Sequence, residues 1–119
     1  MTRRTVLVCD NETVLRALVR ATLEPDYEVL EAHDGDEALA LVRSTRPDLL
    51  LLDMMMPGRS GLEVLAELRE AGETLPVVMV TARAQAADRV RAADAGADRF
   101  LSKPFSPAEL EALVAELLA

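Results

Sequence analysis

Polar side chains with chemical potential stand directly after four short apolar runs of this sequence. They are two carboxylates, an amide, a hydroxyl and an ammonium, namely Asp10, Asn11, Asp53, Thr81 and Lys103. Crowded carboxylates repel one another, and a hard divalent cation such as Mg²⁺ relieves that repulsion through oxygen ligands. A cation beside Asp53 would neutralise an incoming phosphoryl group, so that this carboxylate could attack it. Lys103 and the Thr81 hydroxyl could bind the remaining phosphoryl oxygens, and the set therefore predicts phosphoryl transfer onto Asp53.

The sequence around these residues alternates short apolar runs with longer amphipathic stretches, five times along the chain. We expect strands at 5–9, 27–32, 49–52, 77–80 and 99–102, helices at 12–23 and 85–95, and three more helices after the caps Asp34, Ser60 and Ser106. Runs that are apolar throughout are typical of strands buried on both faces of a parallel sheet. Right-handed crossovers bring the carboxyl ends of such strands to one edge, where ligands bind.

Each of these residues also has an ordinary interpretation. Asp10 or Asn11 could cap the helix at 12–23, which would then bury one face that includes Val14. Asp53 could be a turn residue, and Thr81 could simply end a strand. Each interpretation is plausible alone, but together they leave unexplained why four strands carry such groups to one edge.

Composition limits the class of protein. The chain has 119 residues, with 13 basic and 21 acidic side chains and a net charge of −8, so direct binding to nucleic acid is not expected. Half of the residues are hydrophobic, which excludes a disordered chain. No apolar run approaches the roughly 18 residues of a membrane span. Cys9 is the only cysteine, which favours a reducing cytoplasm. The length predicts a single domain over residues 1–119.

The sequence resembles a response-regulator receiver domain of bacterial two-component signalling. The matching pieces are LVCDNE, LLLLDMMMPGRSG, VVMVTAR, GADRFLSKPF and SPAEL, which extend over almost the whole chain. The resemblance implies a flavodoxin-like (βα)5 doubly wound fold, with a five-stranded parallel sheet of order 2-1-3-4-5. It leaves open whether the chain is a stand-alone receiver or the N-terminal part of a longer regulator.

The resemblance also implies roles for individual residues. Asp53 would be the phosphoacceptor, Lys103 the phosphate-binding lysine, and Thr81 the switch hydroxyl. Mg²⁺ or Mn²⁺ would bind to Asp10, Asn11, Asp53 and the backbone carbonyl of Met55. Phe100 would be the switch aromatic, the Lys103–Pro104 peptide bond would be cis, and Met55 and Arg83 would tune the lifetime of the phosphoryl group.

Two positions depart from the family pattern. Asn11 stands where the second acid of the metal-binding pair is usual, and an amide oxygen brings no charge, so we expect weaker Mg²⁺ binding. Phe100 cannot donate the hydrogen bond that a tyrosine could. The helix at 85–95 has Val90 as its only large apolar residue, which predicts low local stability.

The resulting hypothesis is a regulatory domain, not an enzyme with a substrate of its own. It would take a phosphoryl group from a histidine kinase or phosphotransfer protein and present a changed surface, formed by the fourth helix, fifth strand and fifth helix, to an effector domain or protein. It could form a homodimer on activation. The alternative is a pseudo-receiver that works through protein contacts alone, because Asn11 impairs its metal site. A haloacid dehalogenase-type hydrolase and a flavin-binding flavodoxin are less well supported by the loop after the first strand.

Overall fold

Strands and helices alternate along the chain in the computed structural model, which describes residues 3–82 and 85–119. The elements are β1 (Thr5–Cys9), α1 (Thr13–Leu23), β2 (Glu28–Ala32), α2 (Gly35–Thr45), β3 (Leu49–Asp53), α3 (Gly61–Glu70), β4 (Val77–Thr81), α4 (Ala86–Ala95), β5 (Arg99–Ser102) and α5 (Pro107–Leu117). The five-stranded sheet has the order β2-β1-β3-β4-β5, and all neighbouring pairs are parallel. This confirms the predicted flavodoxin-like fold, with every strand end within one residue of its predicted position.

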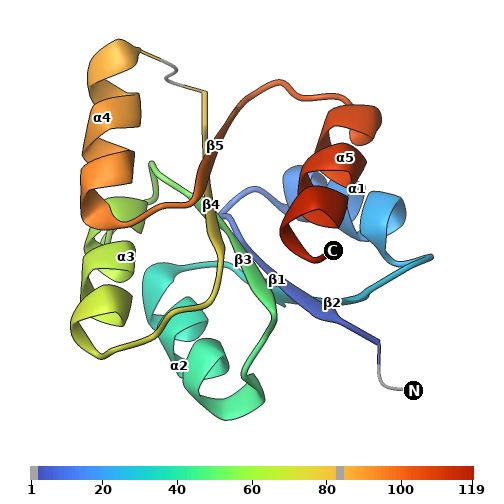
Figure 1. Ribbon diagram of the computed structural model, residues 1–119, viewed down its shortest axis with the longest axis horizontal. Coiled ribbons are helices and arrows are strands. Elements are labelled where there is room, and N and C mark those ends of the chain that lie inside the picture. Colours follow the sequence, from blue (N-terminus) through green and yellow to red (C-terminus); the bar gives the residue numbers. More distant parts are fainter. Residues whose placement is uncertain (1–2, 83–84) are drawn as a thin grey trace.

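Helices cover both faces of the sheet (Figure 1). α1 and α5 pack on one face, and α2, α3 and α4 pack on the other. Successive side chains of a strand point to opposite faces, so Val6 and Val8 of β1 join the core with α1 and α5, whereas Leu7 joins the core with α2 and α3. The burial of β3 and β4 on both faces explains why their sequences are apolar almost throughout.

Side-chain caps fix the starts of three helices. Ser60 and Ser106 each form a capping box with the glutamate three residues later, which satisfies backbone donors at the helix start. Asp34 accepts a hydrogen bond from the backbone N–H of Glu37 at 2.8 Å. All three caps were predicted from the sequence, and they fix where α2, α3 and α5 begin.

The start of α1 differs from the prediction. Asn11 does not cap this helix, because the N-cap is Glu12, whose side chain makes no capping hydrogen bond. Val14 was expected on the buried face, yet it is 81% exposed, whereas Val19 is buried. A helix turns about 100° per residue, so Val14 lies about 140° around the helix from Val19. The apolar side of α1 therefore extends beyond the core into solvent.

α4 attaches to the molecule through small side chains. Ala92 is buried, but Val90 is 58% exposed, so the only large apolar residue of this helix does not anchor it. The helix ends at Gly96, whose φ of +106° suits a residue without a side chain. The weak apolar burial predicted from the sequence is confirmed, and low local stability of α4 stays a prediction.

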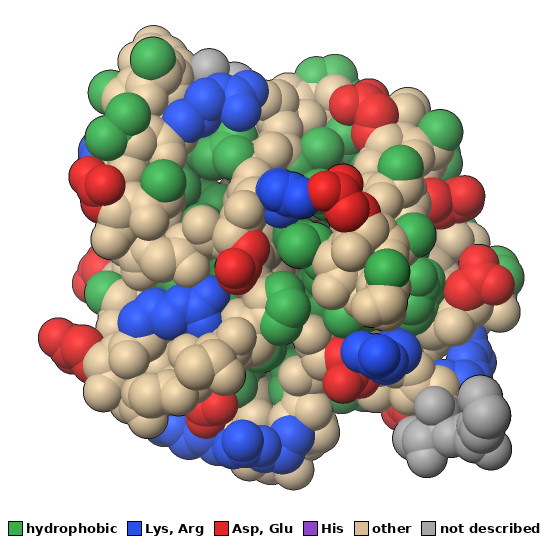
Figure 2. Space-filling model, viewed as in Figure 1, with side chains coloured by type: hydrophobic (Ala, Val, Ile, Leu, Met, Phe, Trp, Pro, Cys, Tyr) green, Lys and Arg blue, Asp and Glu red, His purple; other side chains and the backbone are tan. Residues whose placement is uncertain are grey.

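The surface carries charges of both signs. On the face shown in Figure 2, Lys and Arg side chains lie among Asp and Glu side chains rather than in one continuous basic area. Exposed ion pairs of the molecule include Arg43 with Glu67 at 3.2 Å and Arg59 with Asp36 at 3.1 Å.

Over residues 3–82 and 85–119, no helix has both the length and the apolar character needed to cross a membrane.

Candidate functional site

The parallel sheet brings four of the predicted residues to one edge. Asp10 follows β1, Asp53 ends β3, Thr81 ends β4, and Lys103 follows β5. Asp53 is paired in register with Val80, and Thr81 with Ser102, so the ends of β3, β4 and β5 are level. Asp10, Asp53 and Thr81 are all at most 4% exposed. Buried polar side chains gathered at strand ends form a built site rather than a chance arrangement.

Lys103 lies at the centre of this group. Its Nζ is 2.8 Å from Asp10 Oδ2 and 3.6 Å from Asp53 Oδ2. Its backbone N–H donates to the Thr81 carbonyl at 2.8 Å, and the Lys103–Pro104 bond is cis, as the resemblance implied. Burial alone would lower the pKa of Lys103, but the hydrogen bonds to Asp10 and Glu12 and the charges of Asp53 and Asp10 together outweigh burial and raise this pKa. Lys103 therefore carries a full positive charge at neutral pH.

The Asp53 carboxylate is held by its neighbour and perturbed by its surroundings. Its Oδ1 accepts a hydrogen bond from the backbone N–H of Met55 at 3.1 Å. Burial, and then repulsion from Asp10, raise the pKa of Asp53 to about 6, against the opposing effects of the Met55 N–H and Lys103. A buried carboxylate next to a second carboxylate and an ammonium is a combination found at reactive sites.

The loop after β1 is fixed by hydrogen bonds to Asp10. The Asp10 N–H donates to the Ala32 carbonyl at 3.1 Å, its Oδ1 accepts from the backbone N–H of Glu12 at 2.8 Å, and its carbonyl accepts from the Arg16 guanidinium. Arg16 is held in turn by Glu31 at 3.0 Å. Asn11 lies exposed in this loop. The Asp10 carboxylate is thus aimed into the site by the backbone on both sides of it.

The remaining predicted site residues are Met55, Phe100 and Arg83. The Met55 side chain is 52% exposed, and Phe100 is half-buried on β5, with the Arg89 guanidinium over its ring. Arg83 lies outside the described residues. Sequence reasoning missed Glu12, whose Oε1 is 3.1 Å from Lys103 Nζ, and Arg16. A signal for Glu12 was present, because it directly follows Asp10 and Asn11.

The donor set fits a hard divalent cation. Asp10 and Asp53 present carboxylate oxygens from adjacent strands. Burial and then repulsion from Asp10 raise the pKa of Asp53, and a cation would offset that repulsion. No group of three or more His, Cys, Asp and Glu side chains suited to a metal is found where the structure is described. Mg²⁺ keeps several waters and needs only one or two protein carboxylates, so the pair Asp10 and Asp53 fits this cation.

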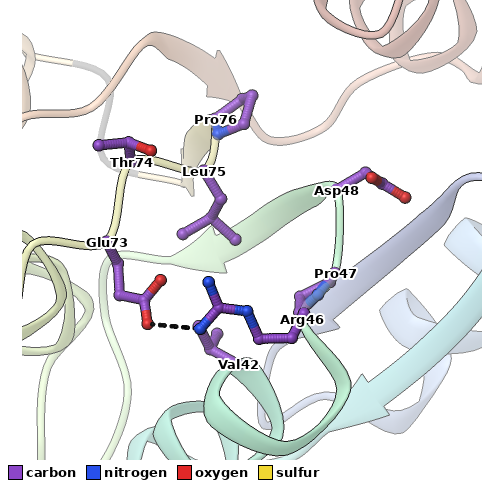
Figure 3. A pocket seen from close by; sticks show the side chains of 8 residues that line it. All are labelled: Val42, Arg46, Pro47, Asp48, Glu73, Thr74, Leu75 and Pro76. Atoms are coloured by element: carbon purple, nitrogen blue, oxygen red, sulfur yellow. Dashed lines mark hydrogen bonds and ion pairs between the residues drawn. The ribbon is translucent and has the colours of Figure 1, made fainter.

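Two hollows differ in their relation to this site. One of about 420 Å³ lies beside Lys103 and has a mainly apolar lining that includes Val14, Leu18 and Phe105. The other, of about 330 Å³, is lined by residues such as Arg46, which pairs with Glu73 at 3.4 Å (Figure 3). This second hollow adjoins Asp48 and Pro76, which directly precede β3 and β4, so it lies at the edge of the sheet opposite Asp53.

Comparison with known proteins agrees with this geometry. A family model described as a response regulator receiver domain matches residues 6–115. Response regulators named MprA from Mycobacterium avium and Mycobacterium tuberculosis are 46% identical over 114 residues, which are 95% of this chain and 50% of each relative. The chain thus spans about half the length of these curated relatives.

Solved structures show the same likeness. The Vibrio cholerae chemotaxis protein CheY4 is 30% identical with a TM-score of 0.92, and the match covers 98% of this chain and 99% of that one. The receiver domain of the putative response regulator NarL from Mycobacterium tuberculosis is 31% identical with a TM-score of 0.90, covering 98% and 96%. With its five-stranded sheet, its strand-end carboxylates and these matches, the chain belongs to the response regulator receiver domain family of two-component systems.

Proposed function

We propose that this chain receives a phosphoryl group on Asp53 from a phosphohistidine of a sensor histidine kinase or phosphotransfer protein. The observation that carries the proposal is the placement of the only lysine beside two buried carboxylates, with Lys103 Nζ 3.6 Å from Asp53 Oδ2. A phosphoacceptor needs a carboxylate oxygen that can reach phosphorus and a cation that meets the charge of the phosphoryl oxygens. This edge of the sheet holds both.

The reaction is a transfer between a nitrogen and an oxygen atom. An Asp53 carboxylate oxygen attacks the phosphorus atom, a P–O bond forms, and the P–N bond breaks with its electron pair returning to the imidazole. Hydrolysis restores the Asp53 carboxylate: water attacks phosphorus and releases a proton to the solvent, the P–O bond to Asp53 breaks, and the carboxylate leaves with the electron pair as inorganic phosphate forms. Phosphoryl transfer depends mostly on positioning and charge neutralisation, so fixed groups around Asp53 are sufficient.

The neighbours of Asp53 have separate tasks. Lys103 binds one phosphoryl oxygen as a point charge, and the hydroxyl of Thr81, at the end of the adjacent strand, binds another. Mg²⁺ or Mn²⁺ would be held by oxygen atoms of Asp10, Asp53, Asn11 and the Met55 backbone carbonyl. The bound cation supplies charge neutralisation for the phosphoryl oxygens. The Met55 side chain, exposed beside Asp53, slows the approach of hydrolytic water and, with Arg83, sets the phosphoryl lifetime.

The phosphodonor docks on the apolar hollow beside Lys103. Val14 and Leu18 of α1 are 81% and 37% exposed, and both line this hollow. Exposed apolar side chains next to a reactive centre are suited to a partner that must come close enough to transfer a group. We expect the reaction to occur in the cytoplasm, which is supported by the single free thiol of Cys9 because such thiols are typical of reducing compartments.

The readout is a change of the surface formed by α4, β5 and α5. α4 has little buried apolar side chain, and Phe100 of β5 is its neighbour through Arg89. Two charge-assisted contacts to Lys103 and Thr81, worth about 1.5–3 kcal/mol each, match the roughly 5.5 kcal/mol needed to reverse a two-state equilibrium. The altered surface binds an effector domain, an effector protein or a second copy of the chain.

A second candidate function follows from Asn11. This neutral residue stands beside Asp10. Among the described residues, Asp10 is the one buried carboxylate that shares Lys103 with Asp53, since the third carboxylate, that of Glu12, is 61% exposed. A site with too little charge for its cation would leave a pseudo-receiver that acts through protein contacts alone.

One experiment separates the two functions. The chain is incubated with phosphoramidate and Mg²⁺, and its intact mass is followed by mass spectrometry. We expect the mass to increase by one phosphoryl group. This increase should not occur in Asp53→Ala, nor in the parent when Mg²⁺ is chelated before the phosphodonor is added. No mass gain at saturating Mg²⁺ would favour the pseudo-receiver, and a gain retained in Asp53→Ala would place the phosphoryl group elsewhere.

A further inference from the structure

The ammonium of Lys103 is shared among three carboxylates, but unequally. Its Nζ donates to Asp10 Oδ2 at 2.8 Å and to Glu12 Oε1 at 3.1 Å. Asp53 Oδ2 is 3.6 Å away, which is too long for a hydrogen bond. The lysine is therefore bonded to the loop after β1 and only adjoins the phosphoacceptor.

Asp10, Glu12 and Lys103 form a closed ring of contacts. Asp10 Oδ1 accepts from the backbone N–H of Glu12, while Asp10 Oδ2 accepts from Lys103. The Glu12 side chain then returns to the same ammonium. Because this side chain makes no capping hydrogen bond to α1, holding Lys103 is its one described contact.

The two ends of the Glu12–Lys103 pair differ in burial. The Lys103 side chain is 13% exposed, whereas that of Glu12 is 61% exposed. Glu12 thus approaches the ammonium from the solvent side, and Asp10 and Asp53 approach it from within the fold. The carboxylate on the outer side attracts the ammonium away from Asp53 by its charge, and its hydrogen bond, together with that of Asp10, fixes where the ammonium lies.

From this geometry, and resting on the proposed function, we infer that Glu12 is a positioning residue for Lys103. It keeps the ammonium off the attacking Asp53 oxygen and holds it within reach of the phosphoryl group that this oxygen will carry. A hydrogen bond from an ammonium would occupy and stabilise the oxygen lone pair, and so make Asp53 a poorer nucleophile. If Asp10 also held a cation, Lys103 would keep Glu12 as a hydrogen-bond partner.

Three variants test this role. Glu12→Ala removes the contact, and Glu12→Asp keeps the charge but shortens its reach by one methylene. Glu28→Ala is the matched control, because it removes the same atoms from the exposed first position of β2. Each variant is phosphorylated with phosphoramidate at saturating Mg²⁺, and the rate constant is measured from the intact mass.

We expect Glu12→Ala and Glu12→Asp to be phosphorylated roughly five- to tenfold more slowly than the parent, the effect of moving one partly exposed charge-assisted hydrogen bond. Glu28→Ala should match the parent. Unchanged or faster phosphorylation of Glu12→Ala would overturn the inference, and so would parent-like behaviour of Glu12→Asp, because charge without contact would then suffice.

A second measurement reads Lys103 directly. Lys103 is the only lysine, so ¹³C-lysine labelling gives a single side-chain Cε signal in an NMR spectrum taken without metal. This signal should shift in both Glu12 variants and stay in place in Glu28→Ala; an unmoved signal would also overturn the inference. If the parent itself were not phosphorylated, the proposed function would fail, while this NMR comparison would still decide whether Glu12 positions Lys103.

Discussion

The guanidinium of Arg89 lies over the ring of Phe100, 4.6 Å from its centroid. Arg89 also donates from Nη2 to the Ser102 hydroxyl at 3.2 Å. A single arginine of α4 thus contacts two residues of β5, one through a ring face and one through an oxygen. Phe100 has no hydroxyl group with which to donate a hydrogen bond. The cation–π contact instead links β5 to the weakly buried helix α4.

This contact should be measurable as a coupling free energy. In a double-mutant cycle of Arg89→Met and Phe100→Leu, we expect a coupling of about 0.5–1 kcal/mol, the usual range for a partly exposed cation–π pair. Urea unfolding of the four proteins gives the coupling, and amide hydrogen exchange should become faster in α4 of Arg89→Met. If the two substitutions change the free energy of unfolding additively, Arg89 and Phe100 do not stabilise each other.

Arg69 is expected to anchor the other end of α4. Its guanidinium donates to the backbone carbonyls of Gly96, Glu73 and Leu75 at 2.8–3.1 Å, so it ties α3 to the residue that ends α4. Arg69→Met should lower the free energy of unfolding by about 2–4 kcal/mol, because several carbonyls lose their donors. The same change at Arg43, an exposed partner of Glu67, should cost at most about 0.5 kcal/mol. Equal losses in urea unfolding would contradict this role.

Gly61 should tolerate no side chain because of its approach to Asp53. A Cβ atom there would lie 2.2 Å from the Asp53 carbonyl oxygen and 2.8 Å from Met54 Cα, both backbone atoms. Gly61→Ala should therefore cost about 2–4 kcal/mol of unfolding free energy and reduce phosphorylation of Asp53 more than tenfold. Gly35→Ala is the comparison, since its Cβ would meet side-chain atoms of Val64 and Arg59, at 2.7 Å and 3.1 Å, rather than the backbone next to Asp53. A larger loss at Gly35 than at Gly61 would contradict the explanation.

Strand ends were the most predictable part of this molecule. Fully apolar runs of four residues have little freedom in a parallel sheet, so the positions of Asp53 and Thr81 followed from where such runs stop. The serine caps were predictable for a similar reason, because they depend on residues three positions apart. Local patterns were thus enough for the alternation of strands and helices and for the four central residues of the site, whereas the strand order followed from the resemblance to the receiver family.

Contacts that depend on side-chain direction across the fold could not be predicted. Glu12 meets Lys103 across 91 positions of sequence, and Gly61 packs on Asp53 only because the loop before α3 returns beneath the strand end. Val14 was assigned to the core since apolar residues usually face it, but in this chain it lines a surface hollow. These residues needed the three-dimensional arrangement before their environment could be stated.

Asn11→Asp should strengthen binding of Mg²⁺ by roughly three- to tenfold, the effect of one added charge close to a partly exposed cation. Asn11 lies exposed beside Asp10, so an added carboxylate would meet no packing obstacle. Calorimetric or NMR titration with Mg²⁺ measures the affinity without any phosphoryl transfer. Thr74→Asp adds the same charge at the opposite edge of the sheet and should leave the affinity unchanged. No gain in Asn11→Asp would contradict the assignment of Asn11 to the metal site.

Glu31 of β2 should contribute stability that is lost in acid. Hydrogen bonds from Arg20 and then Arg16 lower the pKa of Glu31 below its ordinary value of 4.5. A group with a lowered pKa in the folded state stabilises the fold above its unfolded pKa, and this stabilisation disappears as the pH falls through the folded pKa. Glu31→Gln should therefore be less stable than the parent at pH 7, by at most about 1 kcal/mol because the group is largely solvated.

The difference between the parent and Glu31→Gln should stay constant from pH 7 down to about pH 5 and shrink below pH 4.5, where the parent carboxylate also becomes protonated. Urea unfolding at each pH measures it. The same substitution at Glu28, exposed at the start of β2, is the control. A difference that persists at pH 3, or one that Glu28→Gln reproduces, would mean that Glu31 stabilises the protein through packing or overall charge rather than through its arginine partners. The arginines matter beyond stability, because Arg16 also holds the Asp10 carbonyl; protonation of Glu31 would loosen the loop that carries Asp10.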